Sequence, residues 1–509
     1  MPDDRIVFVG DSITGRGGNG GENGWVAMIG RGLKEATPSS NYTLVPLGGS
    51  GQQVGSWLHT SKSPAPAVDA KPSYLDVKGV DMNIEFNRHT DVLVIMLGMN
   101  DALAPYLSDK PEEFKKWGDK YRDLIQTLRT RLTPRVIALA TPTLCTEDIN
   151  SPKNLVMDKM AEEMKSVAAD EKCILLPTRE AYKEVLYEGR KIRPDFHLNG
   201  DQVHPGLYGH VAIAMGMLRG LGAPDAAKSL FDHWFADLRK KEGAQPLSYE
   251  LSLVPSLPPQ AKLQFRLHVF NPGGQAKLDL PPGWNIHQLK TIPNETLFVL
   301  EAAPDRLVTH IMLHAGGKTR DIAIPAPWLV ATANPGSWQG WNQGKFEAES
   351  AKIPFDDLVR TGTGLLSALA KAELKPGVPF KWGYFVSGVN YGGAGAPGAV
   401  DFAEHTFFGG AEYGYGLRWI QSERARQVII KVSGCSFASS SHLQLWLNGE
   451  SVFTGGPGRP AEATVPLKAG WNLLSFKSNY RQWQWQFLVD IDPVTGDNLD
   501  NLRFSVVPH

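Results

Sequence analysis

The chain has 509 residues and a formal net charge of −1. This length is too great for one hydrophobic core, so we expect two to four domains. The near-zero charge gives no electrostatic reason to expect a nucleic acid or an anionic membrane surface as a partner. No apolar run is long enough to insert into a membrane as a spanning helix. The cysteines Cys145, Cys173 and Cys435 have no metal-ligand or disulfide spacing, so we expect thiols and neither a metal nor an organic cofactor.

The start of the chain, Met1-Pro2-Asp3-Asp4-Arg5, enters a strand-like run almost at once. It has no basic segment followed by an apolar segment, as a signal peptide would have. We therefore expect either a cytoplasmic protein, or a periplasmic or secreted one from which a leader was removed. The residues fit both, and they fit any oligomeric state.

Residues 1–243 alternate short apolar runs with amphipathic stretches. The expected strands are Ile6–Val9, Thr43–Leu47, Val92–Leu97, Val136–Ala140 and Ile174–Leu176. Apolar residues at helical spacing, such as those over 114–128, predict helices between them. This alternation predicts an α/β domain with a parallel sheet covered by helices on both faces. Such sheets bind ligands beyond the carboxyl ends of their strands.

Beyond Gly243 the pattern changes to period two, and glycine- and proline-rich turns become frequent. Four apolar residues that alternate with polar ones predict a half-buried antiparallel strand: Leu263, Phe265, Leu267 and Val269. We expect residues 244–332 to form a small immunoglobulin-like β-sandwich.

A proline-rich stretch then leads to Asn334-Pro335-Gly336, which we interpret as a linker. In the remaining residues, 333–509, short strands and glycine-rich turns predict a jelly-roll domain. Alternating leucines at 443–447 run into Asn448-Gly449, which is typical of a hairpin turn.

Residues able to do chemistry follow several of the predicted strands. Ser12 follows the first strand in Gly10-Asp11-Ser12, and Gly51 follows the second. Asn100 follows the third, and Asp201 and His204 come shortly before the last helix of the domain. Alone, each has an ordinary structural reading as a helix cap, a turn former or a buried histidine. Together they predict one site at the carboxyl edge of the sheet.

The four segments resemble the blocks of the SGNH hydrolase superfamily, also called GDSL esterases. Gly10-Asp11-Ser12 is similar to the first block and Gly51 to the second; Gly98-Met99-Asn100-Asp101 is similar to the third and Asp201-Gln202-Val203-His204 to the last. The first block reads Gly-Asp-Ser-Ile instead of Gly-Asp-Ser-Leu. Gly51, not Gly49, is assigned by aligning the Ser-Gly pair. The resemblance covers roughly the first 240 residues and implies a flavodoxin-like three-layer fold.

The resemblance also implies catalytic roles. Ser12 is the expected nucleophile, His204 its base and Asp201 the carboxylate that orients the imidazole. The backbone N–H groups of Ser12 and Gly51 and the amide of Asn100 are the expected oxyanion hole. Asp11 is expected to shape the turn.

Three further features have competing interpretations. His197 and His210 are rival bases, but neither has an acid at the matching spacing. The glycine run over 15–21 lacks the Gly-Lys-Ser/Thr ending of a phosphate loop, so we interpret it as a flexible loop at the rim of the site. Most tryptophans of the β-half are expected in its core, whereas Trp483 and Trp485, on one face of a strand, could stack on sugar rings.

These features predict a serine esterase that removes O-acyl groups, with acetyl expected, from an oligo- or polysaccharide. Appended jelly-roll modules also resemble those of carbohydrate esterases, which is an argument by fold analogy. Two alternatives stay open: a hydrolase of short-chain lipid or general esters, and a carbohydrate-binding protein with an inactive hydrolase domain.

Overall fold

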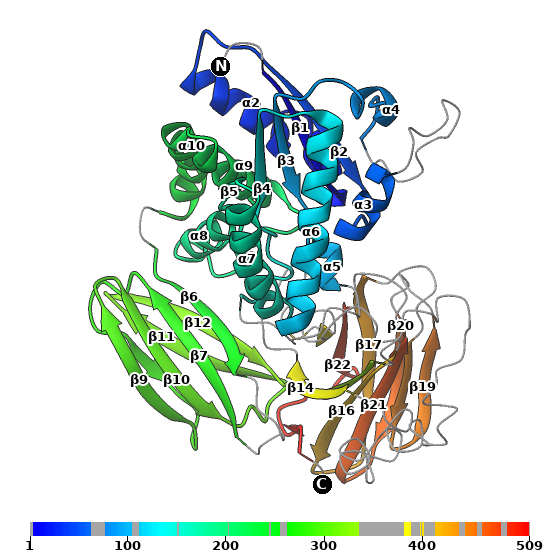
Figure 1. Ribbon diagram of the computed structural model, residues 1–509. Helices are drawn as coiled ribbons and strands as arrows, with labels where there is room; N and C mark the ends of the chain where they lie inside the picture. The colour runs from blue at the N-terminus through cyan, green and yellow to red at the C-terminus, as the bar shows by residue number, and fades with distance from the viewer. Residues whose placement is uncertain are drawn as a thin grey trace. The chain divides into compact units, whose positions relative to one another are not determined.

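The computed structural model describes residues 4–62, 77–103, 111–149, 152–201, 203–243, 246–254, 262–334, 381–387, 398, 400–401, 413–436, 443–455, 461–479, 486–507 and 509. The chain forms two compact units. The first comprises Met1–Gly189 and Phe196–Ala244, and the second comprises Arg190–Asp195 and Gln245–His509. Figure 1 shows the α/β elements of the first and the strands of the second.

A five-stranded parallel sheet lies at the centre of the first unit. Its strands are β1 (Asp4–Asp11), β2 (Tyr42–Gly49), β3 (Val92–Met96), β4 (Val136–Ala140) and β5 (Ile174–Leu176). Their order is β2-β1-β3-β4-β5, and each neighbouring pair is parallel. This is the flavodoxin-like order, in which the strand order reverses at β1 and β3 and leaves a crevice at their carboxyl ends. The predicted fold class of this unit is confirmed.

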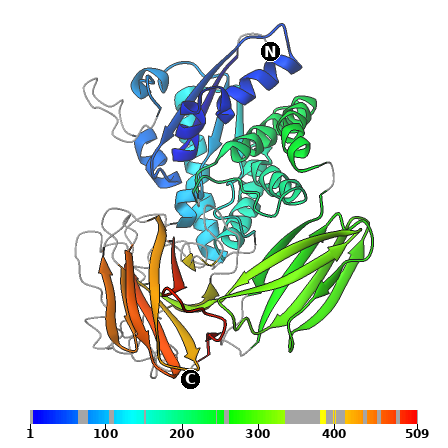
Figure 2. The same cartoon turned by 180° about the vertical axis from the view of Figure 1, so that it is seen from behind.

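Helices cover both faces of the sheet. They are α1 (Ser12–Asn19), α2 (Trp25–Ala36), α3 (Val54–Lys62), α4 (Met82–Glu85), α5 (Met99–Leu103), α6 (Pro111–Leu132), α7 (Pro152–Asp170), α8 (Thr178–Arg190), α9 (Leu207–Gly220) and α10 (Pro224–Glu242). α2, α9 and α10 pack together, and α3, α6 and α7 form a second group. Figures 1 and 2, seen from opposite sides, show the two groups on opposite faces of the sheet. Among the described helices, none has the length and apolarity that a membrane crossing needs.

Most of the glycine run that follows Ser12 is helical, so the prediction of a flexible rim loop is wrong: residues 15–19 lie in α1, and Gly21 begins the short 3-10 helix η1 (Gly21–Asn23). α1 occupies Ser12–Asn19. A side chain on Gly17 would meet the ring of Trp25 at 2.1 Å, and one on Gly48 of β2 would meet the backbone nitrogen of Gly15, also at 2.1 Å. Gly17 and Gly48 are therefore explained by close packing of α1 against its neighbours, which turn chemistry alone did not reveal.

The first part of the second unit consists of two small antiparallel sheets. Their strands are β6 (Ser248–Val254), β7 (Leu263–Phe270), β8 (Lys277–Asp279), β9 (Asn285–Ile292), β10 (Glu295–Ala302), β11 (Val308–Ala315) and β12 (Lys318–Pro325). One sheet has the order β6-β7-β10-β9 and the other β12-β11-β8. The predicted alternation is confirmed in β7, where Leu263, Phe265, Leu267 and Val269 are buried.

The second part also contains two antiparallel sheets. Their strands are β13 (Trp328–Asn334), β14 (Lys381–Ser387), β15 (Val400–Asp401), β16 (Tyr413–Ser422), β17 (Arg426–Ser436), β18 (Leu443–Leu447), β19 (Glu450–Gly455), β20 (Ala461–Leu467), β21 (Gly470–Asn479), β22 (Gln486–Pro493) and β23 (Arg503–Ser505). A seven-stranded sheet runs β14-β13-β16-β21-β18-β19, with β23 beside β16, and a four-stranded sheet runs β15-β22-β17-β20. The predicted hairpin at Asn448-Gly449 joins β18 to β19, and both of its residues have positive φ.

The two parts of the second unit share a hydrophobic core. One cluster joins the small sheets to residues of the seven-stranded sheet, including Leu417 and Trp419. β13 pairs with β14 and β16, so the strand that spans the predicted boundary at residues 332 and 333 belongs to the larger sheet. The division of this half into an immunoglobulin-like domain and a jelly roll stays a prediction.

Candidate active site

Ser12 lies between the first strand and the first helix: β1 ends immediately before it, and α1 begins with it. β1 ends at Asp11, whose carboxylate accepts the Ile13 N–H at 2.9 Å and so caps α1. Ser12 is the first residue of α1, and a backbone N–H at this position has no acceptor within its own helix. The cap is therefore Asp11, and the Ser12 hydroxyl is left for another partner.

That partner is His204. The Nε2 atom of His204 lies 2.8 Å from Ser12 Oγ, and its Nδ1 atom lies 2.8 Å from Asp201 Oδ2. An ionised carboxylate only accepts hydrogen bonds, so Nδ1 carries the proton and Nε2 accepts from the Ser12 hydroxyl. The structure thus brings the three predicted residues into one hydrogen-bonded chain, although Ser12 and His204 are 192 positions apart.

The electrostatics of Asp201 suit this arrangement. Burial alone would raise its pKa, but the hydrogen bond and charge of His204 and the backbone N–H groups of His204 and Val203 outweigh it and lower the pKa to about 2. The two backbone bonds, 2.7 Å from His204 and 2.8 Å from Val203, both end on Oδ1. Oδ2 is thereby oriented toward the imidazole.

The expected oxyanion donors lie at the ends of the two strands that flank β1. Gly51 follows β2 and has a φ of 69°, a left-handed conformation that glycine adopts without strain. Asn100 lies in α5 after β3, with its side chain buried. Because the sheet order is β2-β1-β3, the segments with Gly51, Ser12 and Asn100 are neighbours.

The amide of Asn100 already has two acceptors. Its Nδ2 atom donates to the Gln52 carbonyl oxygen at 3.0 Å and to Asp11 Oδ2 at 3.3 Å. The contact with Asp11 is the longer one, so it is the one that an oxyanion would replace or share. Asp11 therefore does more than shape the turn, because it caps α1 and also orients this amide.

The residues that follow Asn100 and Gly51 also hold each other in place. Both carboxylate oxygens of Asp101 accept the Val54 N–H at 3.3 Å, at the start of α3. Gln53 Nε2 donates to the Asn100 carbonyl oxygen at 3.2 Å. Sequence reasoning missed these roles, although the paired Asn-Asp after a buried strand was the signal that could have indicated them.

His197 and His210, the two rival candidates for the base, differ in their surroundings. His197 is exposed, and His210 lies in α9, where burial, with the nearby charge of Arg16, lowers its pKa to about 4. Arg16 itself was not predicted near the site. Its guanidinium lies 3.6 Å from Asp201 Oδ2 and is half exposed, so its electrostatic contribution is screened by water.

Two predictions concern residues away from this site. Trp483 and Trp485 lie outside the described residues, so sugar stacking on them stays a prediction. Of the other tryptophans of the β-half, Trp328 and Trp419 are buried, while Trp446 and Trp471 pack against a hydrophobic cluster, as core residues would. Within the described part of the chain, no three His, Cys, Asp or Glu side chains are grouped so as to hold a metal ion.

Comparisons with known proteins find similarity to acylhydrolases and esterases. Residues 8–212 match the GDSL-like Lipase/Acylhydrolase family. An acetylxylan esterase of Geobacillus stearothermophilus is 26% identical over 230 residues, which cover 43% of this chain and 94% of that protein.

Similar solved structures cover a comparable part of the chain. A catalytic mutant of Axe2, an acetylxylan esterase from Geobacillus stearothermophilus, is 24% identical, covers 44% of this chain and 96% of its own, and gives a TM-score of 0.34. LAE5, an alpha/beta hydrolase enzyme from the metagenome of Lake Arreo, Spain, is 25% identical, covers 44% and 98%, and gives a TM-score of 0.33. The family match ends at residue 212, inside the first unit. Residues 8–212 therefore resemble the GDSL/SGNH lipases and acylhydrolases, and this sequence similarity supports an esterase.

Proposed function

We propose that this protein is a serine esterase that hydrolyses O-acetyl esters on an oligo- or polysaccharide through an acyl-enzyme. The observation that carries the proposal is the hydrogen-bonded chain from Ser12 through His204 to Asp201, with both contacts at 2.8 Å. The similarity to an acetylxylan esterase over almost that protein's whole length supports a carbohydrate ester as the substrate.

In the first half-reaction Ser12 Oγ attacks the ester carbonyl while its proton passes to His204 Nε2. The imidazolium that forms is stabilised by Asp201, whose lowered pKa keeps it ionised. Negative charge develops on the carbonyl oxygen, and the donors proposed for it are the N–H groups of Ser12 and Gly51 and the Asn100 amide. The tetrahedral intermediate then collapses, and the sugar hydroxyl leaves with the proton from His204 Nε2.

In the second half-reaction water replaces the sugar. His204 Nε2 removes a proton from the water, the resulting hydroxide attacks the acetyl-Ser12 ester, and acetate leaves as Ser12 recovers its proton. The N-terminus of α1 adds a favourable field for the developing anion, because the first N–H groups of a helix have no intrahelical acceptors.

The test is acetate release from a panel of acetylated glycans by the full chain and by Ser12→Ala. We expect wild type to release acetate from at least one glycan, and Ser12→Ala to release none beyond the blank while still binding that glycan. Wild-type turnover by Ser12→Ala would disprove the nucleophile.

A second assay separates the alternatives. A rate on p-nitrophenyl esters that falls steeply beyond acetyl supports the acetylesterase. Rates that rise with chain length favour the lipid or general ester hydrolase. Glycan binding with no esterase activity and no covalent labelling of Ser12 by a fluorophosphonate favours the carbohydrate-binding protein.

A further inference from the structure

Asp201 and His204 lie in a short loop that closes on itself. The Gly200 N–H donates to the His204 carbonyl oxygen at 2.8 Å, and the Gly206 N–H donates to the Leu198 carbonyl oxygen at 2.7 Å. Asn199 and Pro205 form a β-bridge between these bonds. The position of the imidazole relative to Ser12 therefore depends on what holds residues 198 and 199, where this loop begins.

The buried carboxylate of Glu147 holds residues 198 and 199. Glu147 Oε1 accepts the Leu198 N–H at 3.0 Å and the Asn199 N–H at 2.8 Å, and Glu147 is 1% exposed. A carboxylate this deeply buried is costly unless hydrogen bonds compensate it. From the other side, the Tyr182 hydroxyl donates to Asn199 Oδ1 at 2.6 Å. Burial, with the nearby charges of Glu147 and Asp201, raises the pKa of Tyr182, so this hydroxyl keeps its proton.

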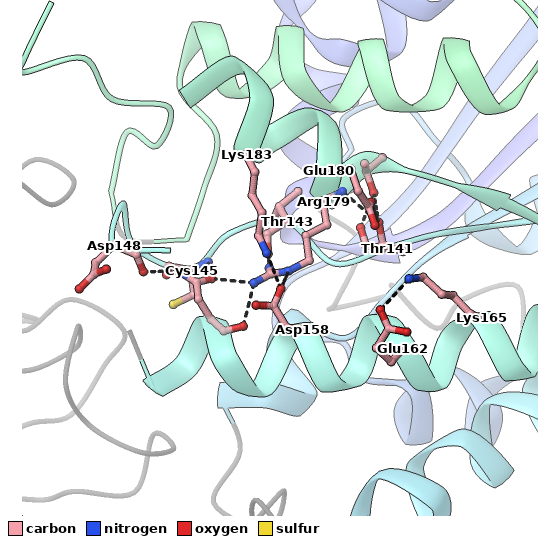
Figure 3. A network of polar contacts seen from close by, with 12 residues as sticks. Thr141, Thr143, Cys145, Asp148, Asp158, Glu162, Lys165, Arg179, Glu180 and Lys183 are labelled. Atoms are coloured by element: carbon pink, nitrogen blue, oxygen red, sulfur yellow. Dashed lines mark hydrogen bonds and ion pairs between the residues drawn. The ribbon is translucent and has the colours of Figure 1, made fainter. Parts of the chain in front are cut away.

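The loop that carries Glu147, between β4 and α7, is held by a hydrogen-bond network on its neighbouring residues. Arg179, with 2% of its side chain exposed, donates to the Thr143 carbonyl oxygen at 2.9 Å and to the Asn154 carbonyl oxygen at 2.8 Å. Asn154 in turn donates to the carbonyl oxygens of Cys145 and Asp148, both at 2.7 Å. Figure 3 shows Arg179 reaching from α8 toward Asp158 of α7 and the loop with Thr143 and Cys145.

The backbone beside Glu147 is strained. Thr146 has a φ of 66°, which is a rare conformation for a β-branched residue, and its side chain is buried. Such strain costs about 1–3 kcal/mol and persists only where the surroundings enforce it. The network around Arg179 and Asn154 provides that constraint, and the loop conformation it enforces is the one that brings Glu147 to residues 198 and 199.

We infer that Glu147 is a positioning residue of the esterase: its carboxylate fixes the Asp201–His204 loop so that His204 Nε2 stays within hydrogen-bonding distance of Ser12. The inference rests on the proposed function. Glu147 touches no reacting atom in it and acts through the loop.

The experiment compares kcat and KM of Glu147→Ala and Glu147→Gln in the full chain with wild type, using p-nitrophenyl acetate. Loss of the acceptor in Glu147→Ala displaces the imidazole, so kcat falls about 10²-fold, because a misplacement of about 1 Å costs that much, while KM changes little. The amide oxygen of Glu147→Gln can still accept both N–H groups, so this variant keeps most of kcat. The rate at which a fluorophosphonate labels Ser12 follows kcat, since it depends on the same activation.

A control separates positioning from loss of folding. Asp91→Ala removes a carboxylate that accepts a backbone N–H, that of Arg5 at 2.9 Å, where β1 begins and away from its carboxyl end. All rates are expressed per folded molecule, measured by circular dichroism. We expect Asp91→Ala to lose stability but keep kcat.

The inference is overturned if Glu147→Ala keeps wild-type kcat per folded molecule, or if Glu147→Gln loses as much kcat as Glu147→Ala. It is also overturned if Asp91→Ala, at equal stability loss, reduces kcat to the same extent as Glu147→Ala. Failure of the proposed function gives a different result, because Ser12→Ala would then match wild type in the same assay.

Discussion

At the scale of single residues, some groups of the candidate site are proposed to react with the substrate, and others hold those groups in position. Asp201 uses Oδ1 for two backbone N–H groups and Oδ2 for the imidazole, so its geometry is fixed before substrate arrives. Asn100 is fixed in a similar way by the Gln52 carbonyl oxygen at 3.0 Å. Fixed dipoles of this kind cost no reorganisation when charge develops on the substrate.

Replacing Asn100 by Ala removes the only side-chain donor proposed for the oxyanion. Because this donor acts on charge that develops in the transition state, we expect kcat to fall about 10²–10³-fold, with a much smaller change in KM. Steady-state kinetics on an acetate ester measure both constants. An effect confined to KM would remove Asn100 from the oxyanion hole.

Asp101 gives a prediction about pH. Burial, only partly offset by the Val54 N–H, raises its pKa from 3.8 to about 7. The folded protein therefore binds more protons than the unfolded chain between about pH 4 and 7, and this group lowers stability as pH rises through that window.

We expect Asp101→Asn, which stays neutral, to lack this loss, so that its Tm relative to wild type increases from pH 5 to pH 8. Thermal unfolding of both proteins across that range measures the difference. A difference independent of pH would show that Asp101 does not titrate there.

At the scale of elements, the site depends on how closely α1 approaches the sheet. A side chain on Gly48 would meet the Gly15 nitrogen at 2.1 Å and the Asp11 carbonyl oxygen at 2.6 Å. These are backbone atoms, which cannot move aside as the end of a side chain can. The position of Ser12 at the start of α1 thus depends on the absence of a side chain at position 48 of β2.

Gly48→Ala is expected to displace α1, lower the free energy of unfolding by about 1–3 kcal/mol as overpacking does, and reduce kcat. Gly55→Ala in α3 is the matched control, because its added methyl group meets nothing within 4 Å. Urea unfolding and esterase kinetics measure both variants. Equal kcat for Gly48→Ala and wild type would contradict the proposed dependence of Ser12 on this packing.

The sheet of the first unit and the candidate triad were predictable from the sequence, for two reasons. Short β-branched runs of the kind seen at Ile6–Val9 define buried strands, and residues after parallel strands gather at one edge. The helix α1 was not predictable from its glycines, because Gly17 is required by its contact with Trp25 and Gly18 by its contact with Pro46, and the sequence does not show these contacts. Glu147 was not predictable either, since it acts on residues 51 and 52 positions away through a loop with no periodic pattern.

At the scale of the whole molecule, the chain has a first unit built on a parallel sheet and a second unit built on antiparallel sheets. In the second unit a hydrophobic cluster is shared between the small sheets and the seven-stranded sheet. The sequence predicted the alternation of buried and exposed residues in strands such as β7. It did not predict a core shared between distant strands, because a period-two pattern shows which face of a strand is buried but not which other strands that face packs against.

Units with separate cores unfold as separate cooperative transitions. We therefore expect calorimetry to resolve two transitions. Fluorophosphonate modification of Ser12 should move only one of them, and the same treatment of Ser12→Ala should move neither. A single transition that shifts as a whole would show that the two units unfold together.

The central claim is that Ser12, activated by His204, becomes acylated during ester hydrolysis. Its most direct test is mass spectrometry of protein quenched within the first turnover of p-nitrophenyl acetate, followed by peptide mapping. The account predicts an acetyl group on Ser12 in wild type and none at this position in Ser12→Ala or His204→Ala. Hydrolysis at the wild-type rate with no acetyl group on Ser12, or with one on a different residue, would contradict it.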